Sequence, residues 1–345
     1  MRRASARNRA LGVYSAISGA GLAAGLMLGG LLTEVSWHWV MFINVPIGLA
    51  VLLLGPRLLP EPRRHPARLD LIGAITSTIG IAALVYGLIR GASDGWVSAP
   101  TIALLAIGAG AFTAFLVVES RTSRPLVPMW LFTQRNRAGS YLNMLLIPAA
   151  MFAVFFFLTQ FTQSVLGFSP LRAGLAFLPL AVAQYLAART APALLPRFGP
   201  KPVTVTGAGL IAAGSAWLTQ VSSSTGYATG LLGPLLLFGL GVGLCFMPLN
   251  MMIVSGLPPE DTGIASGVLQ AMQQVGGSVG LAVLVTVFAA FSDPQAGRSA
   301  SASGTPAAGD EILVHGIAAA FTAGTVLAAV AVVVALFALR HGREA

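Results

Sequence analysis

The chain is 345 residues long, and 56% of it is hydrophobic while only 9% is charged. Soluble globular domains carry about 25% charged residues, so a chain this poor in charge cannot cover a surface that faces water. The composition therefore excludes a soluble enzyme and a disordered tail. It also excludes a disulfide-stabilised scaffold, because Cys245 is the single cysteine of the sequence.

The formal net charge of +9 does not indicate a nucleic-acid partner. Proteins that bind nucleic acids gather their basic residues on one face or along one stripe. Here 19 arginines and one lysine lie almost entirely in short gaps between long apolar runs. This is the pattern of topology signals in a polytopic membrane protein, and we expect no nucleic-acid partner.

Ten apolar runs have the length of a membrane span. A bilayer core about 30 Å thick needs roughly 20 apolar residues in a helix. Backbone groups in lipid must be hydrogen-bonded within their own segment, so each run predicts a helix and the fold class is an all-α polytopic membrane protein. The predicted spans are residues 10–33, 39–56, 70–89, 99–118, 138–161, 171–194, 202–221, 228–252, 262–290 and 312–339.

The basic residues predict the orientation of these spans. When the tails and alternate loops are assigned to one side, 17 Lys and Arg fall there, and only Arg90, Arg172 and Arg298 fall on the other side. Lys and Arg in short loops stay in the cytoplasm. We therefore expect a multi-pass protein of the plasma (inner) membrane with both termini in the cytoplasm.

The first predicted span carries a glycine motif. Gly21, Gly25, Gly29 and Gly30 are spaced so that one helical face lacks side chains and another backbone can approach it. This helix, followed by Ser-Trp-His-Trp at 36–39 and Phe-Ile-Asn-Val-Pro-Ile-Gly at 42–48, resembles the major facilitator superfamily. It is similar to helices five and six of the fourteen-helix drug:proton antiporter branch. The antiporter motif of that branch, G-x-x-x-G-P-x-x-G-G, matches except that Leu26 replaces its proline.

Later segments resemble the same branch in the same order. Residues 128–137, 160–179 and 258–280 are similar to its ninth helix, its ninth-to-tenth turn and its thirteenth helix. Residues 193–202 resemble a degenerate copy of its cytoplasmic motif G-x-L-x-D-R-x-G-R-K. Pro196 occupies the acidic position of this motif, so Arg197, Gly199 and Lys201 predict a tight basic turn without a charge relay.

The resemblance implies an organisation and a function. The ten spans would correspond to helices five to fourteen, as in a member that lacks the first four. Residues 1–57 would be a two-helix remnant of the N-terminal bundle, 58–120 two linker helices, and 121–345 the C-terminal six-helix bundle. The implied function is secondary active transport, as in multidrug efflux and antibiotic resistance: proton-coupled export of hydrophobic or cationic drug-like compounds by alternating access. The implied protein is not an enzyme.

Polar residues within the spans are the candidates for a substrate cavity, because they are costly in lipid and usually face the interior of a bundle. Three glutamines at i, i+3 and i+4 share one face of the ninth span. The alternative role for all such residues is interhelical hydrogen bonding. The candidate cavity residues are Asn143, Phe156, Gln160, Gln163, Gln184, Tyr185, Asn250, Gln270, Gln273 and Gln274.

The energy source and the partners are inferred from the positions of the acidic residues and from the resemblance. None of the eleven acidic residues falls in the middle of a predicted span, and the resemblance places a coupling acid in the first helix of the family. We expect a proton gradient as the energy source, with no metal, no cofactor and no catalytic residue. The expected partners are the lipid bilayer and a small hydrophobic or cationic substrate; a periplasmic adaptor stays undecided.

Two other functions are alternatives to export. The first is a truncated, non-transporting membrane remnant or scaffold. The second is an integral-membrane enzyme, for which Glu260 and Asp261 form the one candidate acid pair at a cytoplasmic face. These two acids stand without a nearby His or Cys, and we interpret them as acids at the start of a helix, where they are favoured by the helix dipole.

Overall fold

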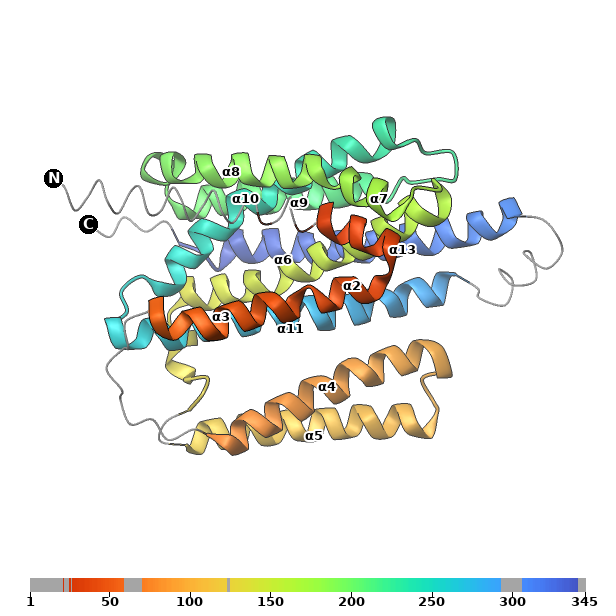
Figure 1. Ribbon diagram of the computed structural model, residues 1–345. Coiled ribbons are helices and arrows are strands. Elements are labelled where there is room, and N and C mark those ends of the chain that lie inside the picture. The colour runs from red at the N-terminus through yellow and green to blue at the C-terminus, as the bar shows by residue number, and fades with distance from the viewer. Residues whose placement is uncertain are drawn as a thin grey trace.

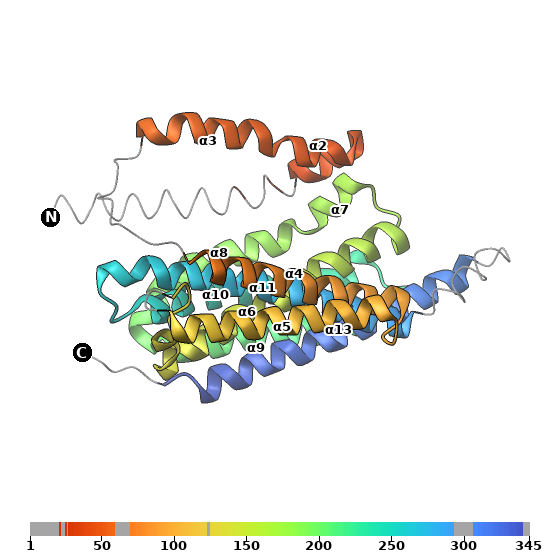
Figure 2. The ribbon, with the colours of Figure 1, turned by 90° about the horizontal axis from the view of Figure 1, so that it is seen from below.

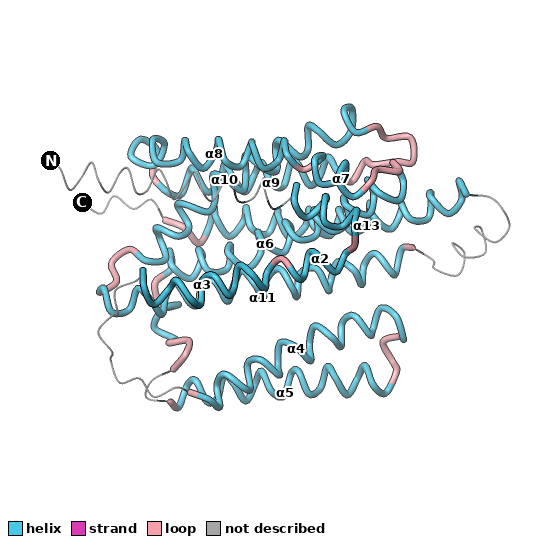
Figure 3. Tube along the Cα trace, in the orientation of Figure 1, coloured by secondary structure: helices cyan, strands magenta, loops and turns pink. Residues whose placement is uncertain are grey.

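The computed structural model describes Gly21, Gly25 and residues 27–58, 70–122, 125–292 and 306–340. Within these residues every regular element is a helix and none is a strand, as Figure 3 shows. The predicted all-helical fold class is therefore confirmed. Residues 27–35 are helical and lead into the first numbered helix.

Figure 1 shows the helices in their order along the chain. They are α2 (Trp37–Phe42), α3 (Asn44–Leu58), α4 (Leu71–Asp94), α5 (Ala99–Arg121), η1 (Met129–Phe132), α6 (Arg135–Gln160), η2 (Phe161–Val165), α7 (Pro170–Ala176), α8 (Leu178–Phe198), α9 (Pro200–Leu218), η3 (Tyr227–Leu231), α10 (Leu232–Val254), α11 (Pro259–Phe291) and α13 (Pro306–Phe337). The element η1 is a 3₁₀ turn, whereas η2 and η3 are π-helical turns.

Eight helical segments of the described residues are long and apolar enough to cross a membrane. The first predicted span, 10–33, lies mostly outside the described residues. The seventh, 202–221, overlaps α9 (Pro200–Leu218), a 19-residue helix that is not among these eight segments. The helix α13 begins at Pro306, six residues before the predicted start of the last span.

Helices α6, α8, α9, α10, α11 and α13 form one bundle. Helix α10 packs against α6, α8 and α9, while α13 packs against α6, α9 and α11. Aromatic rings fill the space between α6, α11 and α13: the ring centroid of Phe157 lies 5.4 Å from that of Phe288 and 6.4 Å from that of Phe321. Phe157 and Phe321 are fully buried and belong to the hydrophobic core of the bundle.

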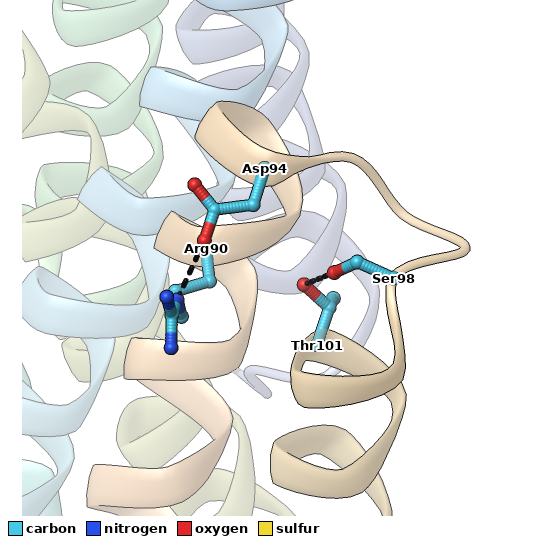
Figure 4. A network of polar contacts seen from close by, with 4 residues as sticks. All are labelled: Arg90, Asp94, Ser98 and Thr101. Atoms are coloured by element: carbon cyan, nitrogen blue, oxygen red, sulfur yellow. Dashed lines mark hydrogen bonds and ion pairs between the residues drawn. The ribbon is translucent and has the colours of Figure 1, made fainter.

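Helices α4 and α5 form an antiparallel hairpin beside this bundle (Figure 1). At its tip the Arg90 Nε donates to Asp94 Oδ2 at 2.7 Å, and the Ser98 hydroxyl bonds the Thr101 hydroxyl at 2.8 Å, as Figure 4 shows. The hairpin is held to the bundle through α4, which packs along α11. There the Thr286 hydroxyl lies 3.4 Å from the backbone oxygen of Leu88.

The segment from residue 27 to the end of α3 lies on another side of the bundle, where Figure 2 shows α2 and α3. Its side chains are mostly apolar and exposed; Leu52, for example, is 69% exposed. Such a surface is covered by lipid or by other helices in a membrane protein. A break at Ile43 divides the predicted span 39–56 into α2 and α3.

Candidate functional site

One close crossing in the bundle brings α11 against α6 through glycines. A Cβ added at Gly276 would lie 2.7 Å from the carbonyl carbon and 2.8 Å from the Cα of Leu145. A Cβ at Gly277 would lie 2.9 Å from the ring of Phe152, and one at Gly280 would collide with Ala149. Small residues allow two membrane helices to approach backbone to backbone. This crossing fixes α11 and the polar side chains on it relative to α6.

The predicted glutamines lie one to two turns before these glycines on the same helix. Gln273 is half-buried, and its amide Nε2 lies 3.7 Å from the sulfur of Met144 on α6. Gln270 and Gln274 are exposed. Gln273 thus faces α6, whereas the side chains of Gln270 and Gln274 are exposed beside the crossing.

The C-terminal part of α6 holds a second set of candidates. Phe156 is 38% exposed, with its ring in an edge-to-face contact with Phe157 at 5.1 Å between centroids. Gln160 is half-buried at the last position of α6, and Gln163 is exposed in the π-helical turn η2. Phe156 and Gln160 are four residues apart and share one helical face.

The remaining cavity candidates are placed differently from one another. Asn143 is fully buried: its Nδ2 donates to the Gly139 oxygen at 3.0 Å, and its Oδ1 accepts no hydrogen bond. A substrate reaches this oxygen only if helices move apart. Gln184 and Tyr185 of α8 and Asn250 of α10 are half-buried. The Asn250 amide donates to its own helix, at the Phe246 oxygen.

The glycine motif meets the bundle at one residue. A Cβ at Gly30 would lie 2.9 Å from the Cα of Leu171 and 3.0 Å from the oxygen of Pro170, at the start of α7. At Gly21, Gly25 and Gly29 a Cβ would meet no atom within 4 Å. The backbone of the motif helix therefore approaches the bundle at the last of its four glycines.

The predicted basic turn joins α8 to α9. Gly199 is its one residue between the two helices, and its φ of +78° is a conformation that favours glycine. Arg197 is exposed and Lys201 is half-buried on either side of it. Arg197 and Lys201 thus lie on either side of a turn between two helices, at one end of the bundle.

Two buried charged residues were not predicted as functional. Glu119 is 2% exposed at the end of α5, where its two carboxylate oxygens accept from the backbone N–H of Leu126 and Val127 at 3.1 Å each. Arg137 is also 2% exposed, in the first turn of α6. In the sequence both residues stand among loop charges, so no pattern distinguished them. Within the described part of the chain no group of three His, Cys, Asp or Glu residues could hold a metal ion.

Together the eight membrane-length helices and the glycine-mediated crossings between them define a polytopic helical membrane protein. The sequence profile of the Major Facilitator Superfamily matches residues 2–281. The chain belongs to this superfamily.

Curated relatives of the chain carry names that describe drug resistance or export. The puromycin resistance protein of Streptomyces alboniger is 39% identical over 93% of the chain and 64% of its own length. The cephamycin export protein of Amycolatopsis lactamdurans is 40% identical over 81% of the chain and 59% of its own length. The tetracenomycin C resistance and export protein of Streptomyces glaucescens is 36% identical over 82% of the chain and 53% of its own length. The chain spans about three fifths of the length of these relatives.

Proposed function

We propose that the chain contributes to the export of hydrophobic or cationic drug-like compounds across the plasma membrane, driven by an inward proton gradient. The observation that carries this proposal is the 36–40% identity with three proteins named for resistance to, or export of, antibiotics. Their compounds differ, so a site that tolerates different shapes fits this function better than a site for one compound.

The surface beside the α6–α11 crossing supports this proposal chemically. Gln270, Gln273 and Gln274 offer amide donors and acceptors, and Phe156 offers an exposed aromatic ring on α6. Apolar contact holds a hydrophobic compound, and an aromatic ring attracts a cation by about 0.5–2 kcal/mol. Amide groups orient a ligand without requiring a particular charge. Substrate sites of secondary transporters lie near the middle of the membrane between two repeats that move relative to each other.

The finer assignments belong to the same proposal. The spans correspond to helices five to fourteen of the fourteen-helix branch, with α4 and α5 as its linker pair and both chain ends in the cytoplasm. The resemblance places the coupling acid in the first helix of that branch. A transporter of this mechanism needs two bundles, so export requires the preceding helices of the branch.

The test compares export by the chain as given with export by the chain preceded by its upstream coding sequence. Each is produced in a host that lacks its own drug pumps, and puromycin and a fluorescent cationic dye are followed in everted membrane vesicles. We expect vesicles that contain the longer form to accumulate both compounds while a proton gradient is present. The accumulation should stop when an ionophore collapses the gradient. Equal export by both forms would refute the need for two bundles. Absence of export from both would favour a non-transporting scaffold.

A matched pair of variants tests the glutamine face. Gln273→Leu removes an amide that faces α6, and we expect it to change the concentration that gives half-maximal export. Ser278→Ala lies on the same helix, but its exposed hydroxyl donates to the Gln274 oxygen of its own helix at 2.6 Å. We expect Ser278→Ala to export normally. If both variants export like the parent protein, the glutamine face is not part of the substrate site.

A further inference from the structure

The first turn of α6 has an unusual charge for its position. Its residues 135–137 are Arg-Asn-Arg, and the turn contains no acidic side chain. The N-terminus of a helix carries a partial positive charge, so arginines are unfavourable there. The two arginines must therefore be stabilised by groups outside their own helix.

Arg137 finds these groups at the end of α10. Its Nε donates to the Ile253 oxygen at 3.0 Å, and its Nη2 donates to the Ser255 oxygen at 3.2 Å. The last carbonyls of a helix lack partners within the helix and carry its partial negative charge. A guanidinium at this place satisfies two of them with charge-assisted hydrogen bonds. The ring of Trp130 lies 5.9 Å from the guanidinium carbon.

Arg135 and Asn136 form hydrogen bonds with the end of α13 and the residues that follow it. Arg135 Nη2 donates to the oxygen of Phe337, the last residue of that helix. The Asn136 Oδ1 accepts from the backbone N–H of Arg340 at 2.7 Å. One turn later, a Cβ at Gly139 would lie 2.7 Å from that of Ala338, so the two backbones are close as well. Three successive residues of α6 thus bind the ends of two other helices.

The last turn of α10 depends on such a contact. Pro248 stands inside α10, where it has no N–H to donate to the preceding turn. The carbonyls of Ile253, in the last turn of α10, and of Ser255, which follows the helix, are bound by Arg137. Arg137 thus adds two hydrogen bonds near the end of a helix that has one backbone donor fewer at Pro248.

We propose that Arg135, Asn136 and Arg137 form an end clamp, which joins the ends of α10 and α13 to the start of α6. The end clamp makes this end of the bundle move as one body, and Arg137 is its main positioning residue. The clamp itself is independent of substrate and of the proposed function. Only its consequence for export, that loss of the clamp slows transport without changing substrate affinity, rests on the proposed function.

Hydrogen exchange measured by mass spectrometry on the detergent-solubilised chain tests the clamp without any transport assay. We expect Arg137→Ala to speed the exchange of amides near the end of α10, residues 250–257, by roughly tenfold or more, because the variant loses two charge-assisted hydrogen bonds and one alone is worth about a factor of ten. Asn136→Ala should speed exchange at residues 338–340 and leave α10 unchanged. Arg189→Ala, an exposed arginine on α8, is the matched control and should change neither region.

Arg137→Lys distinguishes positioning from charge alone. Lysine keeps the positive charge but lacks the planar fork that reaches two carbonyls, so we expect only partial recovery of protection. This variant also serves if Arg137→Ala fails to fold. Unchanged exchange at the end of α10 in both variants would overturn the proposal. So would exchange that rises equally over all helices, because that result indicates general instability.

A transport measurement tests the consequence separately. In the longer form, Arg137→Lys should lower the maximal export rate severalfold while the concentration for half-maximal export stays the same. A change in that concentration alone would contradict a positioning role. If no form exports any compound, the proposed function fails, while the exchange pattern still decides whether the clamp exists.

Discussion

The α6–α11 crossing gives the sharpest test of the fold. Alanine at Gly276 would place its Cβ 2.7 Å and 2.8 Å from the carbonyl carbon and Cα of Leu145. Two carbon atoms in van der Waals contact lie about 3.5–4.0 Å apart, so the helices would have to separate by about 0.8 Å or more. The neighbour is backbone and cannot rotate away. Overpacking of this kind costs about 1–3 kcal/mol.

Gly267 on the same helix provides the control, because a Cβ there would meet no atom within 4 Å. Both Gly→Ala changes gain about 1 kcal/mol of helix propensity, so the difference between the two variants isolates the packing cost. At about 2–4 °C per kcal/mol, Gly276→Ala should melt about 2–12 °C below Gly267→Ala. The assay is thermal unfolding in one detergent, followed by intrinsic tryptophan fluorescence. A Gly276→Ala protein that melts at or above the temperature of Gly267→Ala would refute the close crossing.

Two further predictions concern contacts outside this crossing. Gly30→Ala should loosen the contact with Leu171, so that amides at the start of α7 exchange faster; Gly29→Ala should not, because a Cβ at Gly29 meets no atom within 4 Å. Glu119→Gln should weaken the hydrogen bonding of the backbone N–H groups of residues 126 and 127 by about 1.5–3 kcal/mol in total, because the charge is lost and the amide nitrogen of Gln cannot accept from either N–H. Faster exchange of these two amides, compared with that in Ser120→Ala, checks the result, and equal exchange in the two variants contradicts it.

Much of the fold was predictable because lipid imposes a simple length rule. Runs of about 20 apolar residues predicted helices, and eight membrane-length helices are present among the described residues. The length rule does not register breaks inside a span. The break at Phe177 divides the predicted span 171–194 into α7 and α8, and it depends on local backbone geometry that hydropathy does not report.

Predictions at the level of single side chains were weaker, for a physical reason. Residue type and spacing indicate which side chains share a helical face, as for the three glutamines of α11, but they do not indicate which helix that face meets. Burial of Glu119 and Arg137 depends on backbone groups from distant segments, 7 to 118 residues away. The sequence therefore counted both among ordinary loop charges. Whether the predicted cavity residues bind a substrate stays a prediction.

The α4–α5 hairpin has a consequence for the proposed export, because it limits how a compound could reach α11 from the bilayer. Because α4 lies along α11 and Thr286 contacts the Leu88 backbone, the hairpin occupies that flank of the bundle. A compound dissolved in the surrounding lipid cannot approach α11 sideways through this flank. A compound that enters the bundle sideways from the lipid must therefore do so on a side that α4 and α5 do not cover.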